Sequence, residues 1–179
     1  MAGPYPMAKS ESFFIRATVT SSGTSYVQSE IDLGSFVNLG VKSSTLLRIH
    51  NIQAQYLDNS DFGAMIYYDG GIPGGQLQWQ LTTQSQSALV NAANKSFVSG
   101  GCFRQASTTG VLVQTADDKA DMNPQEWTQG YLIGVDTLYF ACDSSATWDS
   151  GDIDVSIVME CTLESATQAS STALALSQQ

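Results

Sequence analysis

Charged side chains are scarce in this chain, and positive charge is the scarcest. Only 13% of the 179 residues are charged, and seven Lys and Arg stand against 17 Asp and Glu, which gives a net charge of −10. The basic residues are scattered along the chain, so no basic patch is available to neutralise phosphates. This pattern excludes direct nucleic-acid binding and disfavours binding to anionic membranes.

The polarity of the chain comes instead from Ser, Thr, Asn and Gln. An uncharged polar surface is buried against another subunit at a small desolvation cost, because few charges leave water. The composition therefore favours a chain that assembles with its own copies as a homo-oligomer, with a secreted domain as the alternative. Residues 1–10 contain no apolar segment typical of a signal peptide, and no apolar run reaches membrane-spanning length. We therefore expect synthesis and folding in the cytoplasm.

Residues that perform chemistry are also few. His50 is the single histidine, and the alternation of its strand predicts that it shares a face with Leu46 and Ile52. A Ser-His-Asp or Cys-His site would need this residue, yet no GxSxG or SxxK sequence accompanies it. No zinc-ligand spacing, no nucleotide-binding glycine motif and no identifiable pair of glycosidase carboxylates is present. We predict a protein that is not an enzyme, with no catalytic and no cofactor-binding residues.

Two acidic segments supply the candidate metal ligands. Calcium takes six to eight oxygen ligands, often from Asp and backbone carbonyls. The spacing of an EF-hand is absent, so solvated acidic loops remain the alternative to a calcium site between subunits. The candidates are Asp143, Asp149, Asp152 and Asp154 in segment 143–154 (DSSATWDSGDID), and Asp117, Asp118 and Asp121 in the other segment.

The dominant hydrophobic period is two, which is typical of half-buried β-strands. Segment 153–163 is the clearest case, because apolar residues alternate with polar ones along its length and Val158 is the one exception. Two packed sheets bury such faces, and eight strands in a sandwich is the number found in a jelly roll. We predict an all-β protein, an antiparallel β-sandwich with a single jelly roll of about eight strands; an immunoglobulin-like sandwich is the rival. The expected strands are 12–20, 25–33, 46–57, 62–68, 76–83, 96–103, 111–115, 131–141 (parted near Asp136) and 153–163.

The two ends differ from the rest of the chain. Residues 1–10 hold Pro4 and Pro6 and predict an extended N-terminal arm. Residues 164–179 (ESATQASSTALALSQQ) lack aromatic residues and nearly all charge, which predicts a C-terminal arm that is helical only when docked. The body, residues 11–163, is the β-sandwich domain. Segment 85–94 is expected to be a short helix or an ordered loop.

Three segments carry a resemblance to a known family: 11–16 (ESFFIR), 30–37 (EIDLGSFV) and 47–52 (LRIHNI). They resemble the single jelly-roll major capsid proteins of tailless icosahedral viruses, most of all the membrane-containing archaeal and bacterial ones. The resemblance implies a structural virion protein that pairs with a second capsid protein and has no catalytic residues. It also implies an indirect association with an internal membrane that separates the shell from the genome.

Other functions remain open beside the capsid hypothesis. Exposed tryptophans on a sandwich stack on sugars, so a carbohydrate-binding module, or a subunit of an appendage or filament, is the alternative. The residues that would bind sugar are Trp79, Trp127 and Trp148.

Overall fold

The computed structural model describes residues 11–71, 73–108, 111–116 and 122–179. The predicted N-terminal arm (residues 1–10) and the acidic candidates Asp117, Asp118 and Asp121 lie outside these ranges. In the described residues the strands are β1 (Phe13–Thr20), β2 (Val27–Asp32), β3 (Ser43–Asp58), β4 (Gly75–Thr82), β5 (Phe97–Thr108), β6 (Val111–Ala116), β7 (Tyr131–Ile133), β8 (Thr137–Ser144) and β9 (Ile153–Thr167). A 3₁₀ helix, η1 (Pro124–Glu126), and an α-helix, α1 (Gln168–Ser177), complete the fold.

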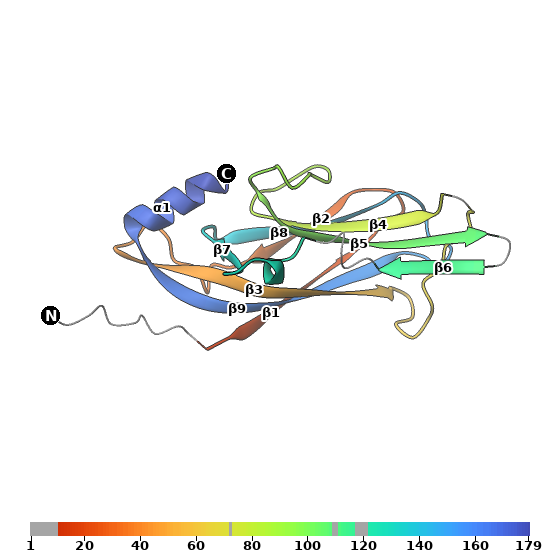
Figure 1. The fold of residues 1–179 in the computed structure, drawn as a ribbon, viewed down its shortest axis with the longest axis horizontal. Helices are drawn as coiled ribbons and strands as arrows, with labels where there is room; N and C mark the ends of the chain where they lie inside the picture. The colour runs from red at the N-terminus through yellow and green to blue at the C-terminus, as the bar shows by residue number, and fades with distance from the viewer. Residues whose placement is uncertain (1–10, 72, 109–110, 117–121) are drawn as a thin grey trace.

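The strands form two packed antiparallel sheets (Figure 1). One sheet has the order β1-β9-β3-β7 and the other has the order β2-β8-β4-β5-β6. Apart from β6, which adds an edge strand, the strands pair first with last and inward from there: β1 with β9, β2 with β8, β3 with β7 and β4 with β5. A long hairpin rolled on itself gives this order, which is that of a jelly roll. The predicted fold class is confirmed.

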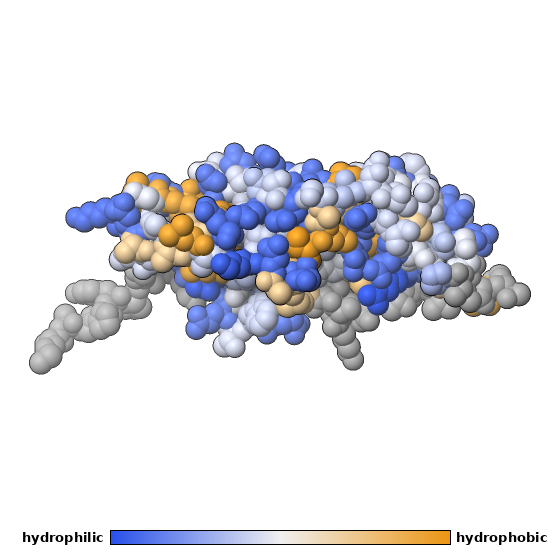
Figure 2. Space-filling view, turned by 90° about the horizontal axis from the view of Figure 1, so that it is seen from above, coloured by the Kyte–Doolittle hydropathy of each residue, from blue (hydrophilic) through white to orange (hydrophobic). Residues whose placement is uncertain are grey.

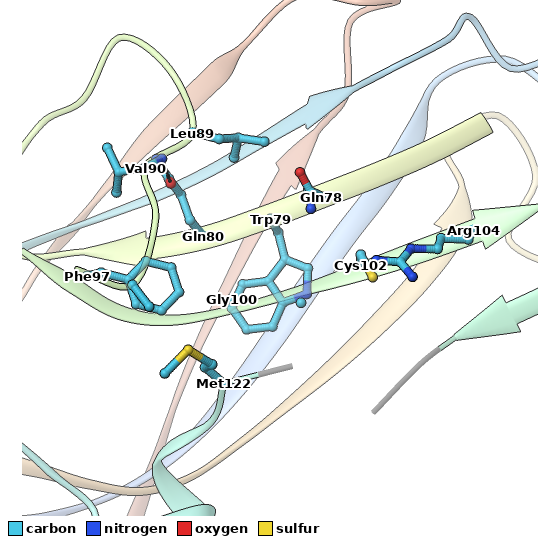
Figure 3. Close-up of a pocket in the computed structure, with 12 residues that line it drawn as sticks. Gln78, Trp79, Gln80, Leu89, Val90, Phe97, Gly100, Cys102, Arg104 and Met122 are labelled. Carbon is cyan, nitrogen blue, oxygen red and sulfur yellow. Dashed lines mark hydrogen bonds between the residues drawn. The ribbon is translucent and has the colours of Figure 1, made fainter. Parts of the chain in front are cut away.

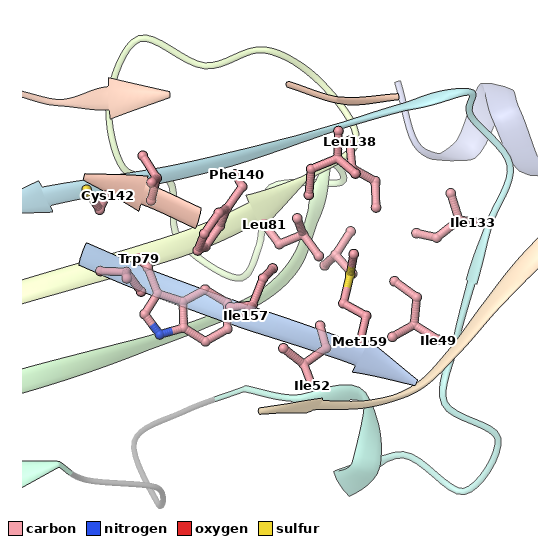
Figure 4. Close-up of a cluster of buried hydrophobic side chains, with 14 of the residues drawn as sticks. Ile49, Ile52, Trp79, Leu81, Ile133, Leu138, Phe140, Cys142, Ile157 and Met159 are labelled. Carbon is pink, nitrogen blue, oxygen red and sulfur yellow. The ribbon is translucent and has the colours of Figure 1, made fainter. Parts of the chain in front are cut away.

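The alternation seen in the sequence separates core from surface in the longest strands. In β9, Ile153, Val155, Ile157 and Met159 are fully buried, and the residues between them are partly exposed. These side chains meet Leu81, Phe140 and others from the facing sheet, as Figure 4 shows. Successive Cβ atoms of a strand point to opposite sides of the sheet. One side of β9 therefore faces the core, and the other side faces solvent.

A β-bulge changes the expected orientation of residues in β3. The pairing of β3 with β9 shifts between Ile49 and Asn51, and the extra residue reverses which face of the strand looks inward. Leu47 and Ile49 are buried before the shift, and Ile52 is buried after it. The prediction that His50 shares a face with Ile52 was therefore wrong, since strict alternation does not continue through a bulge.

Segment 62–68, predicted to be a strand, is a loop. Its burial does alternate, because Ile66 is buried and Tyr68 packs on Trp148, while Tyr67 between them is exposed. Contacts with the ends of the sheets produce this alternation without a partner strand. Segment 85–94 forms a loop without helix, in agreement with one of its two expected forms.

Residues 164–179, expected to form an arm that is helical only when docked, contain the end of a strand and a helix. Strand β9 continues to Thr167, past the predicted domain boundary, and α1 follows with Thr167 as its N-cap, whose side chain accepts a hydrogen bond from Ser170 N at 3.2 Å. The helix lies against the end of the sandwich (Figure 1). No helix within the described ranges is long and apolar enough to cross a membrane.

Two buried polar contacts hold this end in place. Ser171 Oγ donates to Ser44 Oγ at 2.9 Å. The side-chain amide of Gln178 donates to the carbonyl of Leu132 at 2.7 Å and accepts from Gly134 N at 2.8 Å. These bonds depend on polar residues in a segment without a strong apolar pattern, which explains why the sequence suggested an arm.

Candidate functional site

The three tryptophans have different environments, and two of them are unavailable to a ligand. Trp79 is buried and its indole N–H donates to the hydroxyl of Tyr56 at 2.9 Å. Trp148 is buried and donates to Ser144 Oγ at 2.9 Å. Trp127 is 51% exposed, in the turn after η1. Of the predicted sugar-binding residues, only Trp127 offers a ring to solvent.

His50 lies beside a small polar network on the outer side of β3. Its Nε2 shares a 2.8 Å hydrogen bond with Thr162 Oγ1. Arg48 forms a bidentate ion pair with Glu164. Its Nη1 also donates a hydrogen bond to the carbonyl of Gln129 at 2.7 Å. The hydrogen bond with Glu164 raises the pKa of the Arg48 guanidinium. The bond to Gln129 holds the turn that carries Trp127 against β3. Strand alternation in the sequence did not predict that Glu164 pairs with Arg48.

The acidic calcium candidates act as acceptors for loop hydrogen bonds. Asp154 Oδ1 accepts from Thr20 Oγ1 at 2.6 Å, and Asp152 Oδ1 accepts from Gly23 N at 3.0 Å. Asp149 Oδ2 accepts from Asp69 N at 2.7 Å. Within the described ranges, no three His, Cys, Asp or Glu side chains gather as a metal site would require. A calcium site that includes Asp143 and these three residues would need oxygens from a neighbouring subunit, and it stays a prediction.

Two of the cysteines lie in the hydrophobic core. Cys142 and Cys161 are fully buried between the sheets. Burial raises the pKa of each thiol to about 12. A thiol that stays protonated at neutral pH is a poor nucleophile and metal ligand.

A hollow that sequence reasoning missed lies on the outer face of β4 and β5 (Figure 3). Its volume is about 180 Å³. Gly100 and Gly101 form a floor without side chains, and a Cβ on Gly100 would come within 2.9 Å of the Trp79 carbonyl. The 83–96 loop forms one wall with Leu89 and Val90, which Figure 3 shows above the strand.

The loop stands over the sheet because one buried side chain holds it. The Gln80 amide donates to the carbonyl of Ala88 at 3.1 Å and accepts from Val90 N at 2.8 Å. The sequence shows no periodic pattern that would predict the position of this loop over the sheet. The hollow has no acid–base pair, and its polar groups Gln80 and Arg104 already have partners, since Arg104 Nε donates to Gln76 at 2.8 Å.

The outer face of the β1-β9-β3 sheet combines uncharged polar residues with three charged ones, Arg16 on β1 and Asp154 and Glu160 on β9. The register places Thr18 beside Ser156 and Ser156 beside Gln55, with Val158 and Gln53 in the next row. Thr18 and Ser156 share a 2.8 Å hydrogen bond. We call this surface the outer β1-β9-β3 face; its exposed members are Phe14, Arg16, Thr18, Gln53 and Gln55.

Apolar surface elsewhere is divided into separate patches. Seen from above, hydrophobic colour appears in separate areas, one of them toward the end that carries α1 (Figure 2). Leu176 of α1 is among the large apolar side chains that are exposed.

No family model matches the sequence, and no curated protein matches it. Among solved structures, the fold is similar to VP1 of Human Polyomavirus 12 in complex with 3'-sialyllactosamine, with a TM-score of 0.49 and 9% identity over 88% of this chain and 100% of that chain. VP1 of Trichodysplasia spinulosa-associated polyomavirus, in complex with sialylated precision glycooligomers, gives a TM-score of 0.48 and 10% identity over 91% and 96% of the two chains. Desmodium yellow mottle tymovirus gives 0.34 and 10% over 93% of each. At these values no residue role is carried over.

Proposed function

We propose that this chain is a structural capsid subunit that assembles with its own copies into an icosahedral virion shell. It has no catalytic role in this proposal. It pairs with a second capsid protein, and the shell belongs to a tailless virus with an internal membrane, the type that segments 11–16, 30–37 and 47–52 resemble. The subunit is made in the host cytoplasm and ends up in the virion.

The observation that carries the proposal is the outer β1-β9-β3 face. Hydroxyl and amide groups form its central row, Thr18, Ser156 and Gln55, and Thr18 and Ser156 are joined by a cross-strand hydrogen bond. Burying the Thr18–Ser156–Gln55 row against a neighbour removes no charge from water, and Arg16, Asp154 and Glu160 beside it are the charged groups that such a contact must pair. Thr18, Ser156 and Gln53 are hydrogen-bonded within the monomer, so their ordering costs less conformational entropy on association.

The jelly-roll strand order is a second, independent support for the proposal. Its strands pair first with last, so contacts between distant parts of the chain hold the two sheets together. Jelly rolls occur in viral shells and in lectins. A two-sheet body with a broad outer sheet face suits repeated packing into a closed, symmetric particle.

Carbohydrate binding is the second candidate, and Trp127 is the observation that favours it. Its ring is half exposed in the turn whose Gln129 carbonyl accepts a hydrogen bond from Arg48, and exposed rings of this kind stack on sugars. If this function is correct, Trp127→Ala abolishes binding on a glycan array, while Phe14→Ala, at another exposed ring, leaves it unchanged.

Assembly is tested by placing like charges on the proposed contact. Gln53→Glu combined with Gln55→Glu adds two carboxylates to the outer β1-β9-β3 face, and we expect loss of large particles in light scattering and negative-stain images. The matched control, Ser87→Glu with Ala93→Glu, adds the same charge to the exposed 83–96 loop and leaves assembly intact. Equal assembly by both variants contradicts the assignment of this face.

A further inference from the structure

The loop between β3 and β4 presents large apolar side chains to solvent. Its described part is residues 59–71 and 73–74, at the end of the sandwich opposite α1 (Figure 1). Phe62 is 63% exposed, Met65 is 55% exposed and Tyr67 is 41% exposed. We call these three side chains the 62/65/67 patch. Exposed aromatic and Met side chains grouped on six residues are typical of contact sites.

Hydrogen bonds to two other segments hold the loop that carries this patch. Tyr68 N donates to the side chain of Gln105, which in turn donates to the carbonyl of Ile66 at 3.1 Å. The carbonyl of Tyr67 accepts from Asp149 N at 3.1 Å, and Asn59 N donates to the carbonyl of Asp152 at 3.0 Å. The loop is thus fixed by β5 and by the β8–β9 connection.

This anchoring has a consequence for binding. Ile66 and Tyr68 bury their side chains against the sandwich, and the backbone between them is bonded to its neighbours. The exposure of Tyr67 is therefore built into the loop. A contact site that is ordered before binding loses less entropy when a partner docks.

Negative charge surrounds the patch. Asp61, Asp149 and Asp152 are exposed on the same loop or on the connection that holds it. Segments 59–71 and 145–152 contain no Lys or Arg. A partner that covers the patch therefore meets an apolar centre with an acidic rim, and complementary charge on the partner is positive.

We propose that the 62/65/67 patch is the docking site for a different protein, one with an apolar contact surface bordered by Lys or Arg. A second copy of this chain does not meet this description, because its seven basic residues are scattered and its net charge is −10. The inference rests on the proposed function in one respect: it assigns this patch to the second capsid protein. Contacts between identical copies are assigned to the outer β1-β9-β3 face instead.

The experiment uses the full chain and synthetic amphipathic peptides as probes. One peptide has a Leu face and a Lys face, the second keeps Leu and replaces Lys with Glu, and the third keeps Lys and replaces Leu with Ser. We expect titration calorimetry to show binding of the Leu/Lys peptide only. Phe62→Ser, Met65→Ser and Tyr67→Ser together weaken that binding at least about tenfold.

Two further variants separate the apolar and the charged contributions. The matched control is Val41→Ser, Met122→Ser and Leu176→Ser, which removes three exposed apolar side chains elsewhere and keeps the affinity. Asp61→Asn, Asp149→Asn and Asp152→Asn keep the oxygen acceptors of the loop, and we expect weaker binding with a reduced dependence on salt. Circular dichroism and thermal unfolding confirm that each variant is folded.

Several results would overturn the proposal. These are equal binding of the Leu/Glu peptide, unchanged binding by the patch variant, and dimerisation of the chain that the patch variant abolishes. Binding to phosphatidylcholine vesicles that depends on the patch, without binding of the Leu/Lys peptide, would make it a membrane contact instead. Particle formation by copies of the chain is scored separately, so loss of particles with intact peptide binding counts against the proposed function alone.

Discussion

Gln178→Ala is expected to destabilise the protein although it changes the second-to-last residue. The side chain is buried and makes two hydrogen bonds, to the carbonyl of Leu132 and from Gly134 N. Alanine leaves both backbone groups without these partners. A buried polar group left unpaired costs about 1–3 kcal/mol, and water at this end of the molecule reduces the penalty, so we expect a loss of about 2–3 kcal/mol in the free energy of unfolding.

Urea unfolding and a thermal scan measure this loss. In a domain of this size, each kcal/mol lowers Tm by about 2–4 °C, so Tm falls by roughly 4–12 °C. Leu176→Ala is the control, because this side chain is 65% exposed on the same helix, and its effect should stay within about 0.5 kcal/mol. A Gln178→Ala variant as stable as the wild type would refute the docking of the C-terminal segment described here.

Three further predictions concern the core, the thiols and calcium. Met159→Ala, at a fully buried position, should reduce the free energy of unfolding by about 2–5 kcal/mol in urea. Cys142 and Cys161 have pKa values raised by burial to about 12, so iodoacetamide should modify them at pH 8 only as the protein unfolds. Because the unfolded thiols ionise near pH 8.5, the stability gained from keeping them neutral is complete below that pH and is lost as pH rises toward 12; pH-dependent urea unfolding checks this sign. Calcium should raise Tm of assembled particles and leave that of the isolated subunit unchanged, and stabilisation of the monomer would contradict a site shared between subunits.

Alternation along the chain predicted most strands because the sandwich has one buried face per strand. Segment 153–163 shows this best, since its apolar residues other than Val158 face the core. The same rule failed at His50, where a bulge shifts the register, and in segment 62–68, where loop anchors imitate a strand. Neither a bulge nor an anchored loop leaves a distinct period in the sequence.

The functional surfaces were less predictable than the strands. Composition indicated uncharged contact surfaces, but it did not show that Thr18, Ser156 and Gln55 lie in one row, because that depends on strand order. Burial of Trp79 and Trp148 also depends on packing between sheets. The pairing of Arg48 with Glu164 joins two strands far apart in sequence, and pattern alone does not bring them together.

Negative-stain microscopy of native material, with mass determination by light scattering, tests the assembly proposal most directly. We expect closed shells of uniform size in which this chain is a major component. A strictly monomeric chain in native material, at high protein concentration, at low and high salt and with calcium, would contradict the proposal that its function is to build a capsid.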